Sequence, residues 1–376
     1  MGFSVAGTAR DAANPLVIAE LGTGHGGDRA RARELIRAAG EAGADCVKFQ
    51  MVYAGEILHP KTGTVPLPGG ETALYDVFKK LETGSDFYAD MKEYAEKAGL
   101  IFLCTAFGPQ SAREVAALRP ALLKVASPEL NYPALLGAAA AAGLPTLLSS
   151  GVSRLAGIEA ALDFFGGAGS AEAERVCLLH CVTSYPAPER DYNLRVVRNL
   201  RNIFGVATGV SDHSLDAELV PSLAVAMGAA AVEKHFCLSR ADGGLDDPIA
   251  LPPDGFARMV RAVKRAAAFA VPGGDGGALI AEMKKERGAE LVEAVLGDGV
   301  KRLALSERAN YERTNRSLHA MRDIAPGEVI RKEAIGVLRT EKVLRPGLPP
   351  SWLESVTGRT ARAFIPAGEG IRFQDI

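Results

Sequence analysis

The sequence predicts an α/β protein in which a (β/α)8 TIM barrel is followed by a small β-rich domain. Strand-like apolar runs alternate with Ala-rich amphipathic segments over the first 270 residues, and eight such runs can be identified. After a Gly-rich stretch at 271–277, the pattern changes to short strands and many turns, which predicts a second domain.

The eight predicted strands are short and nearly continuous in apolar residues, as buried parallel strands are. They lie at Leu16–Glu20, Cys46–Gln50, Ile101–Thr105, Leu122–Ala126, Thr146–Ser149, Val176–Cys181, Gly205–Ser211 and Ala230–His235. Helices are predicted between them, for example at Arg29–Ala42, Asp86–Ala98, Ser111–Ala117 and Ala217–Met227. An open doubly wound sheet is the alternative, but no Gly-rich fingerprint of the required form follows the first strand.

The domain boundaries follow from these patterns. Residues 1–275 are predicted to form the barrel, 276–313 a helical insertion and linker, and 314–376 the small domain. Within the insertion, 278–296 is predicted to be one charged amphipathic helix. The small domain contains two copies of one turn motif, at 324–330 and 365–371. A domain of this size has a small hydrophobic core, so we expect it to pack against a larger surface.

Composition excludes several classes of function. The net charge is −2, with 43 basic and 45 acidic residues, which argues against nucleic acid or an anionic membrane as a partner. The five cysteines lie mostly in apolar runs, which favours buried thiols in a reducing compartment. The N-terminus lacks a signal-peptide pattern, and no apolar run is long enough to span a membrane. We therefore expect a cytoplasmic protein.

Polar residues gather where the predicted strands end. In a TIM barrel these carboxyl ends face one mouth, where active sites are built. A charged side chain there is costly unless it is paired or binds something. The polar residues are Glu20, His25, Lys48, Gln50, Thr105, Lys124, Ser127, Glu129, Ser149, Ser150, His180, Thr183, Tyr185, Ser211, Asp212, His213, Glu233 and His235.

Two histidines, His213 and His235, each lie at the end of an apolar run, about one βα repeat apart. Two neutral imidazoles that converge at a barrel mouth can hold a divalent metal and leave coordination positions open for substrate. The alternative is that one or both are structural histidines held by backbone partners.

Six motifs, taken in order, resemble the sialic acid synthase family. They are Ile18-Ala19-Glu20-Leu21-Gly22 with His25, Val47-Lys48-Phe49-Gln50, Lys124-Val125-Ala126-Ser127, Leu179-His180-Cys181 with Tyr185-Pro186-Ala187-Pro188, Ser211-Asp212-His213 and Glu233-Lys234-His235-Phe236. Asn315-Arg316-Ser317-Leu318 and Leu344-Arg345-Pro346-Gly347 are similar to that family's antifreeze-like (SAF) domain.

The resemblance implies a transferase that condenses phosphoenolpyruvate with a sugar aldehyde to give a 3-deoxy-2-keto sugar acid and phosphate. It implies Mn or Mg bound by His213 and His235, with Glu20 handling a proton. The residues that it implies for phosphoenolpyruvate are Lys48, Lys124, Ser127, Ser149, Thr183 and Ser211, and those for the sugar are Gln50, Glu129, Tyr185, Asp246 and Arg316.

The resemblance also implies a domain-exchanged homodimer. In the family, an arginine that matches Arg316 is donated by the antifreeze-like domain to the active site of the partner subunit. Such an exchange would give the small domain a larger surface to pack against. The alternative for Arg316 is an ordinary surface arginine.

This sequence departs from the family's pattern mainly on the sugar side. Asp247 and Ala250 replace a His and a Ser after the eighth strand, and Gly26 replaces an Asn of the first motif. The third strand is followed by Ala106-Phe107-Gly108 instead of Pro-Phe-Asp. We therefore hypothesise that the reaction type is kept, while the acceptor sugar differs from N-acetylmannosamine.

Two other functions stay open. A Schiff-base aldolase would use a lysine at the barrel mouth, such as Lys48, Lys124 or Lys234. Lys234 adjoins His235 on a strand, so it should point away from the mouth if His235 points in. The second is a carbohydrate-binding protein that does no chemistry, although the retained cationic residues argue against it.

Overall fold

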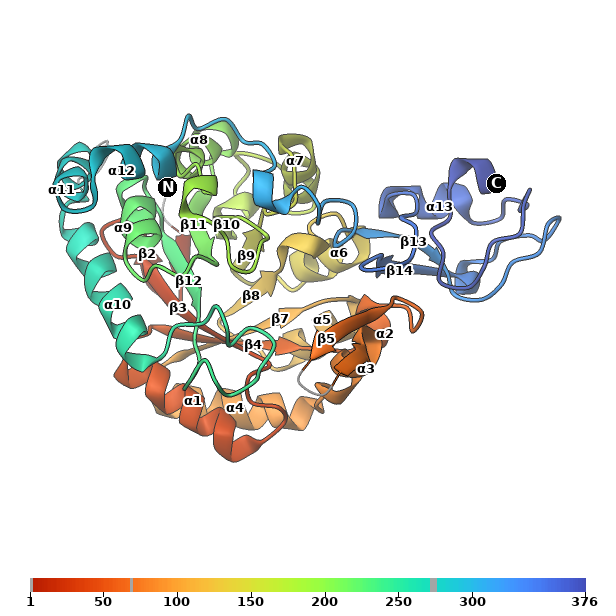
Figure 1. Cartoon of the computed structure of the whole chain (residues 1–376), viewed down its shortest axis with the longest axis horizontal. Helices are drawn as coiled ribbons and strands as arrows, with labels where there is room; N and C mark the ends of the chain where they lie inside the picture. Colours follow the sequence, from red (N-terminus) through yellow and green to blue (C-terminus); the bar gives the residue numbers. More distant parts are fainter. Residues whose placement is uncertain (1–2, 68–69, 271–275) are drawn as a thin grey trace.

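Eight parallel strands close into a barrel (Figure 1). The computed structural model describes residues 3–67, 70–270 and 276–376. Strand β12 hydrogen-bonds to β3, which closes the sheet. All eight predicted strands are confirmed. Around the barrel they are β3 (Leu16–Gly22), β4 (Cys46–Met51), β7 (Ile101–Ala106), β8 (Leu122–Val125), β9 (Thr146–Ser149), β10 (Val176–Cys181), β11 (Ala207–Asp212) and β12 (Ala231–His235).

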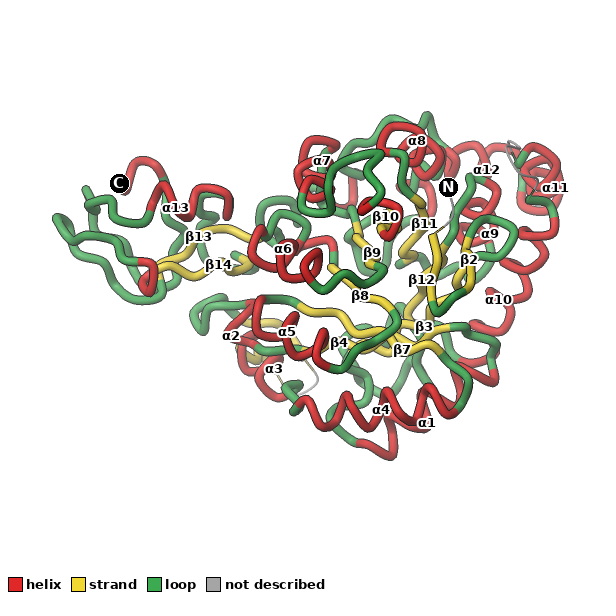
Figure 2. Tube along the Cα trace, turned by 180° about the vertical axis from the view of Figure 1, so that it is seen from behind, coloured by secondary structure: helices red, strands yellow, loops and turns green. Residues whose placement is uncertain are grey.

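Helices surround the strands, as Figures 1 and 2 show from opposite sides. The helix predicted at 217–227 begins later, at Leu219, because Asp216 Oδ1 accepts the N–H groups of Glu218 and Leu219. The surrounding helices are α1 (Arg29–Glu41), α4 (Ser85–Lys97), α5 (Pro109–Ala117), α6 (Pro133–Ala141), α7 (Leu155–Asp163), α8 (Arg195–Phe204), α9 (Leu219–Ala226) and α10 (Pro253–Ala268).

Alternate residues of each strand face the barrel interior, which is filled at its amino-terminal end. Leu16 and Ile18 of β3 pack there with Cys46 of β4. An N-terminal hairpin, β1 (Phe3–Val5) and β2 (Thr8–Arg10), adds Phe3 and Val5 to the same cluster. The inward-facing residues nearer the carboxyl ends are polar, so the open space of the barrel lies at that end.

Two segments extend the barrel between its repeats. After β4 come α2 (Ala54–Ile57), β5 (Thr64–Leu67), β6 (Gly70–Ala73) and α3 (Leu74–Lys80). The insertion predicted as one helix over 278–296 is instead two, α11 (Gly277–Arg287) and α12 (Ala289–Leu296). Gly288 separates them with a φ of +91°, a left-handed conformation that ends one helix before the next begins. Most of the Gly-rich stretch, residues 271–275, lies outside the described residues.

The C-terminal domain lies to one side of the barrel, beyond α2 and α6 (Figure 1). It contains the antiparallel pair β13 (Arg316–Ala320) and β14 (Ile335–Arg339) and the short helix α13 (Leu353–Val356). The two copies of the turn motif pair with each other: Ile324 and Ile365 exchange both backbone hydrogen bonds, at 2.9 and 3.0 Å. Both isoleucines belong to this domain's small core, so the repeat helps to build it.

Candidate active site

A cavity of about 310 Å³ opens at the carboxyl ends of the strands. Every strand of the barrel contributes to it: the contributing side chains are Glu20, Lys48, Thr105, Lys124, Ser149, Cys181, Ser211 and Glu233. Of the residues predicted for the site, all line this cavity except Glu129 and Arg316. Residues from separate repeats meet here because the strands are parallel and side chains alternate between the two faces of the sheet.

The two histidines lie side by side at the cavity. Both are buried, and their ring centroids are 5.6 Å apart. The Nδ1–H of His213 donates to the carbonyl of Val182 at 2.8 Å, because a carbonyl can only accept. This tautomer leaves Nε2 of His213 as the nitrogen with a free lone pair. The Nδ1 of His235 lies 3.7 Å from a carboxylate oxygen of Asp246.

Burial keeps both imidazoles neutral at pH 7. It lowers the pKa of His213 to about 4, with the nearby His235 adding to the effect. It also lowers the pKa of His235 to about 4, against the opposing attraction of Glu20. Neutral imidazole is the form that binds a metal.

The residues present fit a divalent cation bound by two protein ligands. Among the described residues, no group of three or more His, Cys, Asp and Glu side chains could hold a metal. A cation at His213 and His235 would therefore keep several positions for oxygen atoms of water or substrate. The nearby Asp246 carboxylate adds a negative charge that favours a cation here.

A network of buried charges forms the floor of the cavity. Glu233 accepts from Lys48 at 2.9 Å, from Lys124 at 2.7 Å and from the hydroxyl of Ser211 at 2.9 Å. Lys48 also lies 3.2 Å from Glu20, whose other oxygen accepts from Gln50 at 2.5 Å. Two lysines and two glutamates thus share one buried space, each held in place by the others.

The pKa values in this network follow from burial and charge together. Burial raises the pKa of Glu20, because desolvation outweighs the attraction of Lys48. Burial also acts to raise the pKa of Glu233, but the two lysines outweigh it and bring that pKa well below its usual range. The pKa of Lys124 is lowered, because burial and the charge of Lys48 together outweigh the attraction of Glu233.

Hydroxyl and backbone donors form a cradle beside the lysines. Ser127 Oγ lies 2.9 Å from Cys181 Sγ, and both accept from the N–H of Gly151. A side chain at Gly151 would place its Cβ 2.2 Å from Thr183 Oγ1, so only glycine fits between the two loops. The Oγ1 of Thr183 is buried without a hydrogen-bond partner among the described residues. A polar ligand in the cavity would satisfy it.

The side of the cavity expected to bind the sugar is lined by Gln50, Tyr185 and Asp246. Tyr185 stacks on His213 with ring centroids 4.3 Å apart. Asp247, which departs from the family's pattern, does not line the cavity. Its carboxylate accepts from the N–H of Gly244 at 2.7 Å, so it fixes the loop that presents Asp246.

Glu129 and Arg316 are paired with each other instead of lining the cavity. Arg316 donates to Glu129 Oε1 at 3.0 Å, and both side chains are fully buried, so the alternative of a surface arginine is wrong. Arg316 also donates to the carbonyls of Glu56 and Phe107. The C-terminal domain therefore rests on the barrel of its own chain through this arginine, and the sugar-binding roles of Glu129 and Arg316 stay predictions.

The structure adds residues that the sequence analysis did not assign to the site. Glu233 holds both lysines, and the strand alternation that placed His235 at the mouth also predicts this position to face inward. Arg339 of β14 lines the cavity and donates to Glu129 at 2.7 Å. No sequence signal indicates Arg339, because its place depends on how the C-terminal domain docks.

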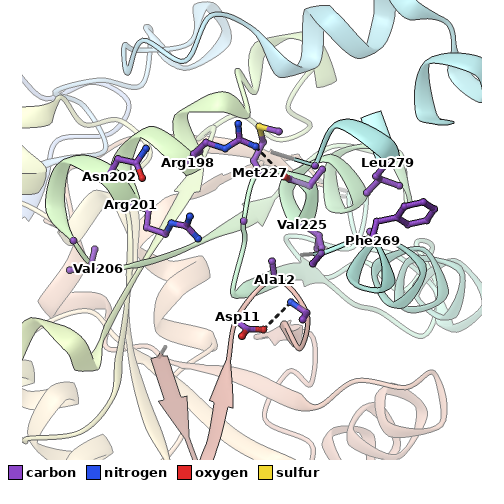
Figure 3. A pocket seen from close by; sticks show the side chains of 17 residues that line it. Asp11, Ala12, Arg198, Arg201, Asn202, Val206, Val225, Met227, Phe269 and Leu279 are labelled. Carbon is purple, nitrogen blue, oxygen red and sulfur yellow. Dashed lines mark hydrogen bonds between the residues drawn. The ribbon is translucent and has the colours of Figure 1, made fainter. Parts of the chain in front are cut away.

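A second cavity, of about 410 Å³, lies at the opposite end of the barrel (Figure 3). Its lining includes residues that precede strands, such as Ala12 before β3 and Val206 before β11. Arg198 and Arg201 of α8 border it, and Figure 3 shows Asp11 across from them. None of the predicted site residues is found there, so the chemistry-bearing groups gather at the carboxyl end.

The chain belongs to the NeuB family. The model of that family matches residues 35–273, and a SAF domain model matches residues 315–376. The predicted sialic acid synthase resemblance and the fold, a TIM barrel followed by an antiparallel SAF domain, are thus confirmed.

Individual relatives are similar over nearly the whole chain. The N,N'-diacetyllegionaminic acid synthase of Legionella pneumophila is 30% identical, over 96% of this chain and 94% of its own. The pseudaminic acid synthase of Campylobacter jejuni is 28% identical, over 96% of each chain. The crystal structure of the spore coat polysaccharide biosynthesis protein SpsE from Bacillus subtilis has a TM-score of 0.80 at 29% identity, covering 100% of this chain and 99% of that one.

None of the helices in the described part of the chain combines the length and apolar character that a membrane crossing requires.

Proposed function

We propose that this protein condenses phosphoenolpyruvate with the open-chain aldehyde of an amino sugar, giving a 3-deoxy-2-keto nonulosonic acid and phosphate. One observation carries the proposal: the histidine pair, the two lysines and the hydroxyl cradle beside them line the same cavity. The cradle suits a phosphorylated carboxylate, and the histidines suit an aldehyde that needs activation. The family membership and the synthase names of the relatives support the same reaction class.

The floor of the cavity is suited to bind phosphoenolpyruvate. Its phosphate and carboxylate groups need cations and hydrogen-bond donors, which Lys48 and Lys124 supply together with the hydroxyls of Ser127, Ser149, Thr183 and Ser211. Glu233 holds both ammonium groups in place before the ligand arrives, so little reorganisation is needed on binding.

The reaction joins C3 of the enol to the aldehyde carbon, and the aldehyde oxygen takes up a proton. Water then adds at C2 and gives up one proton. The C2–O bond to phosphate breaks as the remaining hydroxyl becomes the C2 carbonyl, and that second proton leaves with the phosphate. Glu20 is the group that we assign to the proton of this water, since its carboxylate lines the cavity and burial raises its pKa. A divalent ion, Mn or Mg, held by His213 and His235 would polarise the aldehyde oxygen.

We further propose that the acceptor is not N-acetylmannosamine itself but another amino-sugar aldehyde. The support comes from the departures around Asp246. Asp247 caps the loop at Gly244 and does not line the cavity. The Ala250 that replaces a family serine is buried and offers no hydroxyl.

The contacts of the lysines disfavour an imine-forming aldolase. Lys234 is buried on the outer side of the barrel, where its ammonium donates to Asp212 at 2.6 Å and to the carbonyl of Ser214 at 2.5 Å. The remaining candidates, Lys48 and Lys124, are both ion-paired to Glu233. Both nitrogens donate to that carboxylate, so neither presents a free lone pair to a carbonyl, although burial lowers the pKa of Lys124.

The direct test measures phosphate release from phosphoenolpyruvate with Mn²⁺ and a panel of sugar aldehydes. We expect release with one or more 2-acetamido aldehydes, abolition by a chelator, and a loss of at least about 100-fold in H213A and H235A. H59Q is the matched control, because His59 does not line the cavity. Phosphate release from no aldehyde, or borohydride trapping of pyruvate on the protein, would contradict the proposal. Best turnover with N-acetylmannosamine would contradict only the acceptor assignment.

We also propose a domain-exchanged homodimer and a cytoplasmic location. The Arg316 match supports the first: in an exchanged dimer the contact of Arg316 with Glu129, which forms within one chain here, would form between the two chains. Light scattering on the purified chain should give the mass of a dimer. A monomeric mass would exclude exchange.

The five cysteines are all free and buried, which supports a reducing compartment. Fractionation of the source cells would test the location.

A further inference from the structure

The linker between α12 and β13 passes the barrel mouth beside the ends of β9 and β10. It carries a carboxylate, Glu307, which is only 1% exposed. Glu307 does not line the cavity, and the proposed reaction makes no use of it. A buried carboxylate outside the reaction centre needs a set of donors to offset its desolvation.

The donors to Glu307 are chiefly backbone groups of the two loops that build the cradle. Its Oε2 accepts from the N–H of Val152, after β9, at 3.0 Å and from the N–H of Thr183, after β10, at 3.0 Å. Its Oε1 accepts from the N–H of Ala304 in the linker itself, at 3.0 Å. One oxygen thus ties two separate barrel loops together.

The two tied residues adjoin the atoms of the cradle. Val152 follows Gly151, whose N–H donates to Ser127 Oγ and to Cys181 Sγ. Thr183 carries the hydroxyl that is buried without a partner among the described residues. Because a Cβ on Gly151 would lie 2.2 Å from Thr183 Oγ1, a small separation of the loops would change the shape of the cradle.

Val152 shows that this arrangement is held under strain. Its φ is +42°, a left-handed conformation that β-branched residues rarely adopt. Such a conformation persists only where surrounding contacts impose it. The hydrogen bond from the N–H of Val152 to Glu307 is one such contact, and it comes from a different part of the chain.

A cation of the same linker, Lys301, binds the same loop as Glu307. Lys301 donates to the carbonyl of Ser150 at 2.8 Å, one residue before Gly151. The linker therefore holds the loop after β9 through two contacts, from Lys301 to the carbonyl of Ser150 and from Glu307 to the N–H of Val152.

We infer that Glu307 is a positioning residue, which holds the loops after β9 and β10 in the arrangement that binds the phosphate of phosphoenolpyruvate. The inference rests on the proposed function. The interdomain linker thereby takes part in substrate binding without touching the ligand. Its Glu307 acts through the backbone N–H groups of Val152 and Thr183.

The test compares E307A, E307Q and D191A with the unmodified chain. Asp191 is the matched control, because it lies further along the loop after β10 and accepts from the N–H of Ser306 in the same turn, but binds neither Val152 nor Thr183. We expect E307A to raise the KM for phosphoenolpyruvate about tenfold, and its Kd measured by calorimetry without acceptor by a similar factor. The KM for the acceptor should change less than about twofold. E307Q should lie between, because its amide oxygen can still accept from Val152 and Thr183. D191A should match the unmodified chain.

A rescue experiment separates positioning from general damage. Glycine adopts a positive φ without strain, so V152G should reduce the penalty of E307A in a double-mutant cycle. Unchanged phosphoenolpyruvate binding in E307A would overturn the inference, as would an equal rise in both KM values. If E307A does not fold, the same double-mutant cycle is measured with E307Q in its place, with and without V152G.

The inference and the proposed function fail in different ways. An unmodified chain that binds inorganic phosphate but never turns over phosphoenolpyruvate would refute the proposed function. A Kd for inorganic phosphate that neither E307Q nor E307A changes would refute the role of Glu307 separately.

Discussion

At the scale of single residues, the buried charges of the cavity are the least replaceable feature. Glu233 is 4% exposed and, among the described residues, is the carboxylate that pairs with both Lys48 and Lys124. Removing one member of a buried charge network leaves the others desolvated and uncompensated, and this costs more than the intact network contributes.

We therefore predict that E233Q lowers the free energy of unfolding by about 3 kcal/mol, because Lys48 and Lys124 lose their shared carboxylate. Urea unfolding followed by circular dichroism measures this change. The control is E41Q, which breaks an exposed ion pair with Arg37 and should leave the urea midpoint unchanged. Equal effects of the two variants would show that burial does not set the cost.

Much of the site at this scale was predictable from the sequence. Period-two alternation places Lys48 and His235 on the inner face once the strands are known. The same rule correctly predicts that Lys234 points away from the mouth, where it meets Asp212. The pairing of Arg316 with Glu129 was not predictable, since these residues lie 187 positions apart and meet only through domain docking.

At the scale of elements, the strands were predicted well and the insertion was not. Buried parallel strands give continuous apolar runs, so their signal is strong. The insertion at 278–296 has a helical composition throughout, and Gly288 by itself does not distinguish a helix interior from a break. The positive φ of Gly288 depends on how α11 and α12 pack on each other and on the rest of the chain, which no local pattern records.

We predict that G288A destabilises the protein by about 1 kcal/mol, because alanine is strained at a φ of +91° although the space around this position is open. G157A is the matched control: Gly157 lies within α7 with normal helical geometry and open space, so alanine there should be neutral or stabilising. Thermal unfolding of both variants measures the difference. A stabilised G288A would mean that the two helices merge into the single helix predicted from the sequence.

At the scale of the whole molecule, burial of histidines makes stability depend on pH. Burial lowers the pKa of His25 to about 4, that of His180 to about 3 and that of His319 to about 4. These three do not line the cavity. In the unfolded chain each imidazole titrates near about 6.5, so between about pH 6.5 and pH 4 the unfolded state binds more protons than the folded state.

We accordingly predict that the free energy of unfolding is retained above about pH 6.5 and falls as the pH drops toward about 4. Each of these histidines should lower it by about 2 kcal/mol between about pH 7 and pH 5. Urea midpoints at the two pH values measure the loss. H180N should reduce the pH dependence, since it removes one titrating group. Stability that is the same at both pH values would contradict the burial argument.

The sequence alone predicts the barrel, the end of the barrel that carries the chemistry, and most of the side chains that line the cavity. These properties follow from local periodicity and from the geometry that all parallel barrels share. Other contacts emerge only in the folded molecule: Glu233 joins the two lysines, Arg316 and Arg339 meet Glu129, and Glu307 ties two barrel loops together. Each of these contacts joins residues more than 100 positions apart. Their formation depends on packing between whole elements, and the free energy of that packing is not encoded in any short stretch of the chain.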